Sequence, residues 1–283
     1  MAEIRLAGVS YYHGKGTPYE IKALDSIDLT IRSGIVTGII GHTGSGKSTL
    51  VELFNGILKP TEGTVYLDGE DIWAKPKEIR RVRFRVGLVM QYPEAQLFEE
   101  TIRADIAFGP KNMGLSSEEI SERVIEAAHF VGLDDELLDK SPFDLSGGQK
   151  RRAAIAGIIA MRPEVLILDE PAAGLDPAGR EAVFTNIMNY KKETGATVII
   201  VSHSMEDMAR YCDDIIVMSD GDVMMQGDRD TVFADADKLA AAGLDIPQTA
   251  KLMAALRDRG IDISRRIYTP DAAYSALLAL FNK

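Results

Sequence analysis

The stretch GHTGSGKS (41–48) restricts the possible folds more than any other part of the chain. It follows a short apolar run, IVTGII, and leads into a helical pattern that extends from Ser48 to Leu58. A strand, a glycine-rich loop and a helix in this order indicate a β–α unit of a parallel sheet. The spacing also satisfies G-x-x-x-x-G-K-[ST], the pattern of a loop whose backbone N–H groups surround nucleotide phosphates. A chance match in a glycine-rich turn is the alternative, and the flanking strand and helix disfavour it.

The residue types in this loop suit phosphate binding. Gly41, Gly44 and Gly46 allow the backbone to curl toward an anion, and Lys47 supplies a positive charge for the β- and γ-phosphates. The hydroxyl of Ser48 is a candidate ligand of Mg²⁺. The predicted nucleotide-binding residues of this segment are Gly41, His42, Thr43, Gly44, Ser45, Gly46, Lys47, Ser48 and Thr49.

Polar residues follow three further apolar runs, two of which have the composition of buried parallel strands. At the end of VLILD, Asp169 is placed to bind Mg²⁺, and Glu170 after it is the candidate for orienting or deprotonating the attacking water. His203 follows TVIIVS and would reach the γ-phosphate, while Gln91 follows VGLVM and would reach both Mg²⁺ and the water. Taken alone, an acidic turn, a structural histidine and an ordinary glutamine explain these residues as well. Next to a phosphate loop they indicate a hydrolytic site.

Composition limits the possible partners. The chain has 43 acidic and 32 basic residues among 283 and a net charge of −11, which disfavours a broad nucleic-acid-binding surface. Cys212 is the only cysteine, so an intrachain disulfide is excluded and a reducing compartment is favoured. The first residues lack the pattern of a secretory signal, and no apolar run approaches the length needed to cross a bilayer. We expect a soluble chain that reaches a membrane only through partner subunits.

A second glycine-containing loop, LSGGQ (145–149), precedes another helix-forming run. Exposed N–H groups and the positive end of a helix dipole would suit an anion there, and a plain turn before a helix is the alternative. The ordered set of GHTGSGKS, Gln91, LSGGQ, VLILDEP, GLDP and His203 resembles the ATP-binding-cassette family over most of residues 1–230. This match is specific, because a phosphate loop alone would fit kinases and GTPases equally well.

The resemblance implies ATP and Mg²⁺ as the ligands of a head-to-tail dimer. The implied catalytic residues are Glu170, His203, Gln91 and Lys47, and the implied metal ligands are Ser48, Gln91 and Asp169. The residues of one chain that would face the nucleotide held by the other are Ser146, Gly147, Gly148, Gln149 and, across the same interface, Asp176. The aromatic residue that the family stacks on adenine corresponds to His13, and Tyr12 beside it is the alternative contact.

Several segments resemble the ATPase subunits of energy-coupling-factor transporters, in particular the second of two paralogous types. They are HGKGTPYEIKAL near the N-terminus, QYPEAQLFEETIRADIAFGPKNMG, PFDLSGGQKRRAAIAGIIAMRPEVLILDEPAAGLDP and SHSMED. The resemblance implies pairing with a sibling ATPase or with a second copy. It also implies a transmembrane coupling subunit, a substrate-capturing membrane protein for a vitamin or metal ion, and a peripheral position on the cytoplasmic face of the cell membrane.

Two apolar surfaces are candidates for contact with these partners. In the loop after Gln91, Tyr92, Pro93, Leu97 and Phe98 are large for a surface segment, and they form either a partner patch or a local core. Near the C-terminus, an expected helix begins at Thr269-Pro270 and carries a stripe that serves either dimerisation or docking on its own domain. The stripe consists of Tyr274, Leu277, Leu278 and Phe281.

The predicted fold is α/β, a P-loop NTPase of the ABC-ATPase type. A mostly parallel sheet is expected with an N-terminal antiparallel β subdomain and an inserted helical subdomain at about 93–160. The nucleotide-binding domain is expected to span 1–230, and a C-terminal helical extension 231–283.

Two other classes of protein fit less well. A cassette ATPase working on DNA or ribosomes usually carries a long coiled coil or two cassettes, and this chain has no heptad run and an acidic balance. A pure interaction protein with an inactive nucleotide site conflicts with the filled catalytic positions. The sequence therefore favours a transport ATPase that does not bind nucleic acid.

Overall fold

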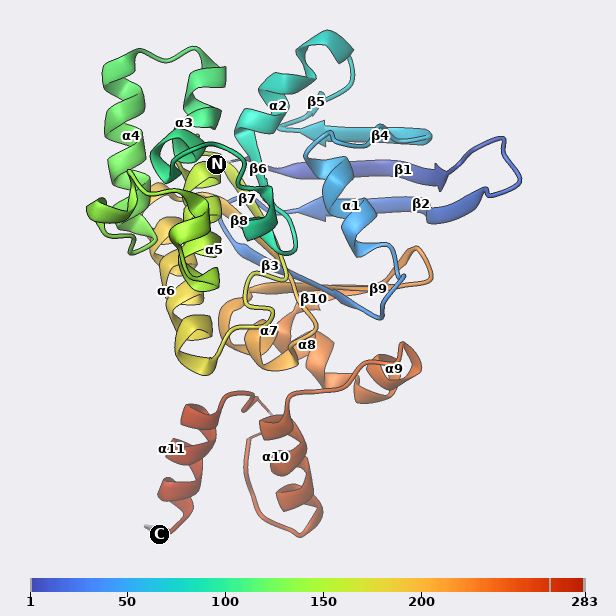
Figure 1. Cartoon of the computed structure of the whole chain (residues 1–283). Helices are drawn as coiled ribbons and strands as arrows, with labels where there is room; N and C mark the ends of the chain where they lie inside the picture. Colours follow the sequence, from blue (N-terminus) through green and yellow to red (C-terminus); the bar gives the residue numbers. More distant parts are fainter. Residues whose placement is uncertain (1, 265, 282–283) are drawn as a thin grey trace.

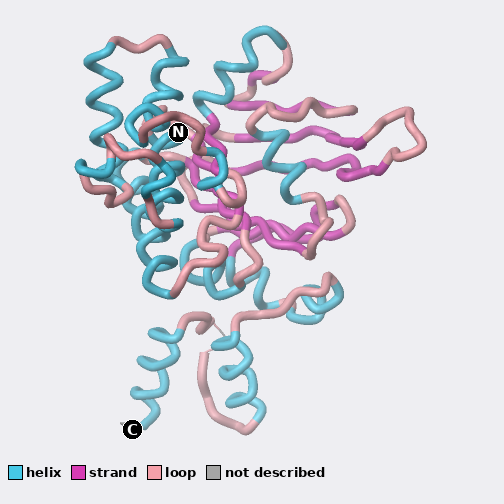
Figure 2. The backbone as a smooth tube through the Cα atoms, in the orientation of Figure 1, coloured by secondary structure: helices cyan, strands magenta, loops and turns pink. Residues whose placement is uncertain are grey.

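Two β-sheets form the centre of the molecule in the computed structural model, which describes residues 2–264 and 266–281 (Figures 1 and 2). An antiparallel sheet has the strand order β2-β1-β4-β5, and a six-stranded sheet has the order β10-β9-β3-β8-β7-β6. The first sheet consists of β1 (Ile4–His13), β2 (Ile21–Ile31), β4 (Glu62–Leu67) and β5 (Glu70–Asp71). The second consists of β3 (Val36–Gly41), β6 (Val86–Val89), β7 (Val165–Asp169), β8 (Thr197–Val201), β9 (Asp214–Ser219) and β10 (Asp222–Asp228).

The six-stranded sheet is parallel except at one edge. Strands β9, β3, β8, β7 and β6 pair in parallel, and β10 pairs with β9 as an antiparallel hairpin. The hairpin turns at Asp220 and Gly221, whose φ angles of 49° and 80° are those of a tight turn with right-handed twist. VLILD and TVIIV are buried parallel strands as predicted. The carboxyl ends of β3, β6, β7 and β8 consequently meet at one edge, where the predicted polar residues follow them.

Helix α1 (Lys47–Phe54) lies between the two sheets. Its buried residues Leu50, Leu53 and Phe54 belong to a core that also includes residues of β1, β2 and one face of the parallel sheet. The helix ends before the predicted Leu58 because Gly56 adopts a left-handed φ of 70° and ends the regular backbone hydrogen bonding.

The opposite face of the parallel sheet is covered by helices that share a second core. Figure 1 places α3, α4 and α5 together at one side of the sheet, within the segment 93–160 that was expected to be helical. The helices before the C-terminal part are α2 (Ile79–Arg85), α3 (Ile102–Met113), α4 (Ser117–Phe130), α5 (Gly147–Ile159), α6 (Pro177–Thr194) and α7 (Met205–Tyr211). Short 3-10 turns occupy Pro76–Glu78, Pro93–Gln96, Asp135–Leu137 and Pro142–Asp144.

The start of α4 has a reciprocal side-chain cap. The hydroxyl of Ser116 accepts from the N–H of Glu119, and the Glu119 carboxylate accepts from the N–H of Ser116. This reciprocal pair satisfies two backbone donors that a helix start otherwise leaves free. Ser116 is therefore the cap of this helix.

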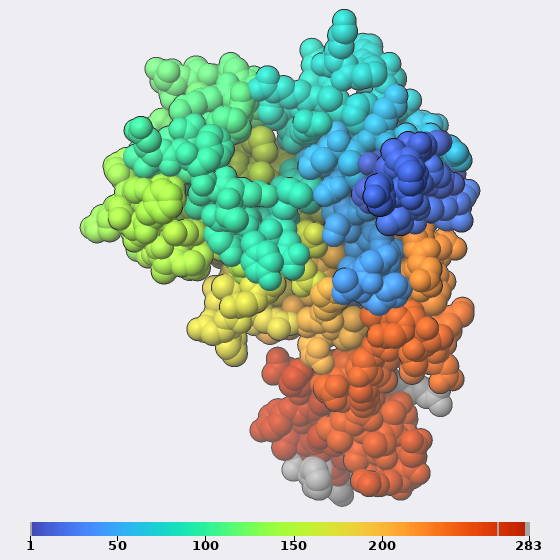
Figure 3. Space-filling view, turned by 45° about the vertical axis from the view of Figure 1, so that its right-hand side comes forward, coloured from blue at the N-terminus to red at the C-terminus, as the bar shows by residue number. Residues whose placement is uncertain are grey.

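Of the four C-terminal helices, the first packs against β10 and the last two extend away from the sheets, as Figures 1 and 3 show. The four are α8 (Arg229–Ala234), α9 (Ala236–Ala241), α10 (Gln248–Asp258) and α11 (Pro270–Phe281). Val232 and Phe233 of α8 belong to the main core, whereas Met253 and Ile263 belong to a separate small one around α10 and α11.

The apolar stripe of α11 divides between that small core and solvent. Leu277 packs against the small core, whereas Tyr274 and Leu278 are 67% and 42% exposed. The side chain of Phe281 lies outside the described residues. The hydroxyl of Thr269 accepts from the N–H of Ala272, which confirms the predicted cap before Pro270.

Cys212 lies in the core between α7 and β3. A Cβ added to Gly38 would lie 2.4 Å from Sδ of Met208 and 2.9 Å from Sγ of Cys212, so the glycine gives these sulfur atoms room against the strand. Burial raises the pKa of the Cys212 thiol far above its usual range. Among the described residues, no helix is both long enough and apolar enough to span a bilayer.

Candidate active site

The phosphate loop connects the buried end of β3 to the start of α1. Gly44 and Gly46 have left-handed φ angles of 84° and 100°, and a Cβ on Gly46 would lie 2.8 Å from the carbonyl oxygen of Ala23. Nζ of Lys47 donates to the carbonyl oxygens of Gly41 at 2.8 Å and His42 at 2.9 Å. The loop therefore curls around the ammonium group of Lys47, which donates to the loop's own carbonyl oxygens.

The first turn of α1 directs backbone donors toward this loop. Gly46 occupies the cap position, and no side chain of the described residues caps the helix there. The uncapped N–H groups and the positive helix end suit a phosphate. Burial lowers the pKa of Lys47, and the nearby carboxyl groups of Glu170 and Asp169 oppose that effect.

The hydroxyl of Ser48 and the carboxyl group of Asp169 meet at the end of β7. Oγ of Ser48 donates to Oδ2 of Asp169 at 3.4 Å. Burial raises the pKa of Asp169, while Ser48 and Lys47 lower it. A hydroxyl and a carboxylate beside a phosphate loop fit Mg²⁺, which takes few protein oxygens and completes its shell with phosphate and water.

Glu170 follows Asp169 in a strained backbone conformation. Its φ is 49°, in the left-handed region that glutamate seldom adopts, and its N–H donates to the carbonyl oxygen of Val201 at 2.9 Å. The side chain is only 14% exposed. Burial, followed by the charge of Asp169, raises the pKa of Glu170 to about 7. A carboxyl group with this pKa can take up and release a proton near neutral pH.

His203 lies directly beside this carboxyl group. Its Nε2 is 3.3 Å from Oε1 of Glu170, and this Oε1 accepts no hydrogen bond of acceptable geometry from any described residue. Burial and then the charge of Lys47 lower the pKa of His203. The imidazole is thus favoured in its neutral form, with one ring nitrogen able to donate and the other able to accept.

Hydrogen bonds connect the loop that carries His203 with the starts of α6 and α7. Ser204 caps α7 by accepting from the N–H of Asp207, and the guanidinium of Arg180 donates to both Ser204 and Asp207. Asp176 caps α6, since its Oδ1 accepts from the N–H of Gly179 at 2.7 Å. Arg180 thereby connects the helix that follows Asp176 to the loop that carries His203.

The segment after β6 divides between core and surface. Gln91 is exposed, and its side chain makes no hydrogen bond with a described residue. Pro93 is buried and Leu97 packs against the main core, whereas Tyr92 and Phe98 are 54% and 65% exposed. Pro93 and Leu97 therefore fit the local core, whereas Tyr92 and Phe98 are exposed and their contact with a partner stays a prediction.

The two candidate adenine contacts lie on opposite faces of β1. Nε2 of His13 is 3.4 Å from Oγ1 of Thr49 in α1, and its ring meets that of Tyr11 edge-on. Tyr12 points to the other face, because side chains alternate along a strand, and the ammonium groups of Lys15 and Lys22 lie 5.3 and 5.5 Å from its ring centre. The structure thus brings His13, and not Tyr12, toward the helix that follows the phosphate loop.

The second glycine-containing loop forms the start of α5. Ser146 and Gln149 make a reciprocal capping box in which each side chain accepts from the backbone N–H of the other residue. A Cβ on Gly147 or Gly148 would meet no atom within 4 Å. No hydrogen bond joins these residues to the phosphate loop within the described chain. The loop that the sequence singled out therefore faces open space.

Three charged residues around these loops, Arg151, Glu94 and Arg180, were not predicted from the sequence. Arg151 is buried and donates to both carboxylate oxygens of Glu94, and Arg180 holds the start of α7. Partners 57 and 27 residues apart leave no local signal. One signal for Arg151 was present: it shares a helix face with Ile155 and Ile159, where a permanently charged side chain requires a buried partner.

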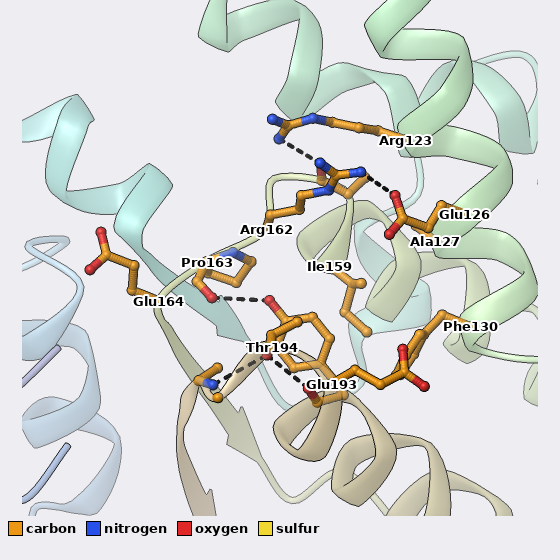
Figure 4. A pocket seen from close by; sticks show the side chains of 14 residues that line it. Arg123, Glu126, Ala127, Phe130, Ile159, Arg162, Pro163, Glu164, Glu193 and Thr194 are labelled. Atoms are coloured by element: carbon orange, nitrogen blue, oxygen red, sulfur yellow. Dashed lines mark hydrogen bonds and ion pairs between the residues drawn. The ribbon is translucent and has the colours of Figure 1, made fainter. Parts of the chain in front are cut away.

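A separate cavity of about 270 Å³ lies between α4, the end of α5 and the end of α6 (Figure 4). Figure 4 shows Arg123, Arg162 and Glu126 on one side of it and Phe130 and Thr194 on another. None of the predicted site residues lines this cavity. We do not assign it to the nucleotide, because the phosphate loop and the two carboxyl groups lie elsewhere.

Comparison with known protein families agrees with this geometry. Residues 24–173 match the family model described as ABC transporter. The chain is 52% identical over 276 residues to the energy-coupling factor transporter ATP-binding protein EcfA2 of Clostridium acetobutylicum, covering 97% of this chain and 96% of the relative. The chain belongs to the ABC transporter family, among its energy-coupling factor transporter ATP-binding proteins.

A second EcfA2 relative is similarly close, and two solved cassette structures are more distant. EcfA2 of Clostridium tetani is 50% identical over 280 residues, covering 99% of this chain and 97% of the relative. The structure of cbiO1 from Clostridium perfringens, part of the ABC transporter complex cbiONQ, is 40% identical with a TM-score of 0.74, covering 89% of this chain and 98% of that one. The dimeric post-hydrolysis structure of the ATP-binding cassette MJ0796, bound to ADP and Pi, is 30% identical with a TM-score of 0.72, covering 80% and 98%.

Proposed function

We propose that this chain is the ATP-binding and ATP-hydrolysing subunit of an energy-coupling factor importer. ATP-driven closure of a dimer, followed by reopening after hydrolysis, would move a membrane coupling subunit for uptake of a vitamin or a metal ion. The observation that carries the proposal is the gathering of Lys47, Asp169, Glu170 and His203 at the carboxyl edge of one parallel sheet. This edge is where nucleotides bind in such sheets.

Glu170 is the proposed base for hydrolysis. Its carboxylate takes the proton of a water whose oxygen attacks the γ-phosphorus, and the bond from that phosphorus to the β–γ bridging oxygen breaks. A pKa of about 7 leaves a large fraction of Glu170 ionised at neutral pH and still basic enough to accept the proton. His203, 3.3 Å away and favoured in its neutral form, orients the γ-phosphate and the water.

Mg²⁺ is the proposed metal, held by Ser48, Asp169 and Gln91. When bound, it neutralises charge on the β- and γ-phosphate oxygens. Within the chain, Lys47 supplies a fixed positive charge at the same phosphates. The uncapped N–H groups of α1 orient them. The segment 41–49 and His13 form the proposed remainder of the nucleotide site, with Tyr12 as the alternative to His13.

The start of α5 is proposed to complete a nucleotide site in a second subunit. Within one chain nothing requires Gly147 and Gly148 to be glycine, since the added Cβ atoms would meet no atom within 4 Å and neither residue has a left-handed φ. A phosphate approaching from a partner gives a reason for their lack of side chains. Ser146, Gln149 and the start of α6 at Asp176 belong to the same proposed interface.

An apolar groove beside the Gln91 loop is the proposed contact for the membrane coupling subunit. The groove, of about 580 Å³, lies between α2, α3 and α5. Phe98 and Phe108 meet edge-on in it and are 65% and 45% exposed, and Arg80 and Arg83 border it. Exposed aromatic residues in a groove suit an amphipathic helix. The chain would then lie at the cytoplasmic face of the cell membrane, held there by its partners, and would not bind nucleic acid.

Two further assignments belong to this proposal. The chain divides into a nucleotide-binding domain (1–230), with a helical subdomain at about 93–160, and a C-terminal extension (231–283). The exposed Leu252, Tyr274 and Leu278 of that extension are proposed to contact the paired ATPase, either a sibling or a second copy.

Phosphate release from ATP by the purified chain tests the proposal. The parent chain should release phosphate in the presence of Mg²⁺ at a rate that rises with protein concentration, and Lys47→Ala should lower that rate by about 100-fold. Co-purification from membranes with mass identification of the bound subunits tests the partners. A parent chain that binds ATP but releases no phosphate, alone or with those subunits, would contradict the hydrolytic role.

A further inference from the structure

The buried guanidinium of Arg151, on α5, contacts two other segments of the chain. One is the loop after Gln91, and the other is the loop after Glu170. Nε and Nη2 of Arg151 donate to the two carboxylate oxygens of Glu94 at 3.1 and 2.9 Å, and Nη1 donates to the carbonyl oxygen of Ala173. Glu94 lies three residues after Gln91, and Ala173 lies three residues after Glu170. Arg151 itself lies five residues after Ser146 on α5.

The Arg151 side chain is 5% exposed and that of Glu94 is 24% exposed. A buried ion pair adds little net stability relative to apolar residues of the same size, because removing both charges from water is costly. What the pair supplies is fixed geometry, since the planar guanidinium matches a carboxylate with two parallel hydrogen bonds. Burial alone would raise the pKa of Glu94, and the hydrogen bonds from Arg151 hold it below its usual value.

The attachments at the other end of α5 are of a different kind. There Arg123 donates to the carbonyl oxygens of Ala160 and Met161 at 3.3 Å, and Arg162 pairs with Glu126 beside the cavity in Figure 4. The side chains of Arg162 and Glu126 are 49% and 57% exposed. Among the described residues, the buried guanidinium–carboxylate pair with two hydrogen bonds is thus at the end of α5 that carries Ser146.

We infer that Arg151 is a positioning residue that makes the start of α5, the Gln91 loop and the segment after Glu170 move as one body. This inference rests on the proposed function. A displacement of the Gln91 loop by a membrane partner would shift Ser146, and with it the part of the site offered to the paired subunit. Arg151 then affects the hydrolytic step, and ATP binding by the phosphate loop of its own chain does not depend on it.

Four variants of the full-length chain test this inference. Arg151→Lys keeps the positive charge but cannot form the two parallel hydrogen bonds to Glu94. Glu94→Gln keeps the shape of the side chain but removes the carboxylate charge. The double variant carries both changes. Arg103→Lys is the matched control, because Arg103 also pairs through Nε and Nη2 with one carboxylate, Asp139, but on the surface.

We expect Arg151→Lys and Glu94→Gln each to lower kcat for ATP by about 10- to 100-fold in the assembled ATPase. ATP affinity of the single chain should stay within about twofold, since the phosphate loop is separate. The kcat of the double variant should be no lower than that of the more impaired single variant, because both substitutions break the same ion pair. Arg103→Lys should leave kcat within about twofold.

Three results would overturn the inference. One is a kcat within about twofold of the parent for Arg151→Lys. A second is additive losses in the double variant. The third is a loss of kcat that disappears when variant and parent are compared at equal fractions folded. If Arg151→Lys does not fold, Glu94→Gln alone decides the outcome. A parent chain without ATPase activity would contradict the proposed function instead.

Discussion

The two glycine-containing loops that precede α1 and α5 differ in what their own chain requires of them. At the phosphate loop, Gly46 has a φ of 100° and no room for a Cβ, and Lys47 closes the loop onto its backbone carbonyl groups. At the start of α5, Gly147 and Gly148 have ordinary backbone angles and open space around them. The first loop is shaped by contacts within the chain, and the second is left accessible from outside.

The caps of the two helices differ in the same sense. The described residues provide no side-chain cap for α1, so its first N–H groups point freely toward the phosphate loop. The start of α5 is satisfied internally by Ser146 and Gln149. This difference supports the proposal that the first loop holds a triphosphate within its own chain, whereas the second loop receives an anion from a partner.

The largest expected effect concerns the acidic group beside the first loop. Glu170→Gln should lower turnover by at least about 100-fold, because the amide cannot accept a proton from water. ATP binding should persist, since Glu170 does not belong to the loop that holds the phosphates. Phosphate release and binding of a fluorescent ATP analogue, measured on the same preparation, check this. Near-normal release would show that the base is another residue.

A substitution in the second loop should separate binding from hydrolysis. Ser146→Arg is expected to lower hydrolysis by about 100-fold, because a bulky cation fills the space proposed for a partner's phosphate. ATP capture by the single chain should be unchanged. Rates measured over a range of protein concentrations check the requirement for a dimer. A rate per chain that is independent of concentration would remove the distinction between the two loops.

Matched glycine substitutions test the comparison through stability. Gly46→Ala should lower the free energy of unfolding by about 1–3 kcal/mol, because the residue has a left-handed φ and its Cβ would lie 2.8 Å from backbone. Gly147→Ala should change it by less than about 0.5 kcal/mol, yet reduce hydrolysis. Denaturant unfolding of both variants gives the comparison. Equal destabilisation by the two would contradict it.

A further expected effect is a gain in stability that depends on pH. The pKa of Glu170 is raised from 4.5 to about 7 in the folded chain, so the folded state binds a proton that the unfolded state releases between these values. Its contribution to the free energy of unfolding is present at low pH and is lost as pH rises toward about 7. Glu170→Gln should therefore stabilise the chain by about 1–3 kcal/mol near pH 8, with the gain fading toward pH 4.5.

The control for this measurement is an exposed glutamate. Glu193 is exposed near the end of α6. Glu193→Gln should change the free energy of unfolding by less than about 0.5 kcal/mol at both pH 8 and about pH 4.5. A gain for Glu170→Gln that is equal at both ends of the pH range would instead indicate relief of packing strain.

Much of the fold follows from the sequence because its signals are local. The runs VLILD and TVIIV are too short for helices and too apolar for exposed strands, and Asp220-Gly221 determines the hairpin between β9 and β10. The end of α1 was less predictable, because the helical pattern continues past Gly56 and only its left-handed backbone ends the helix.

The site divides in the same way. Asp169 ends a strand, Lys47, Glu170 and His203 come after strand ends, and parallel strands bring these ends to one edge. The strained φ of Glu170 depends on a contact with Val201, and the buried ion pair of Arg151 depends on Glu94. Both partners are distant in sequence, so no local pattern indicates them. The roles of the individual residues, and the division at residue 231, stay predictions.

The burial of Cys212 has a practical consequence for following the subunits through their cycle. Its thiol is 1% exposed and is the only one in the chain, so maleimide or nitroxide reagents should leave it untouched under native conditions. A cysteine introduced at the exposed Phe143, beside the second loop, would then carry a fluorophore or spin label as the single reactive position. Approach and separation of paired chains become measurable by spectroscopy without first removing the native cysteine.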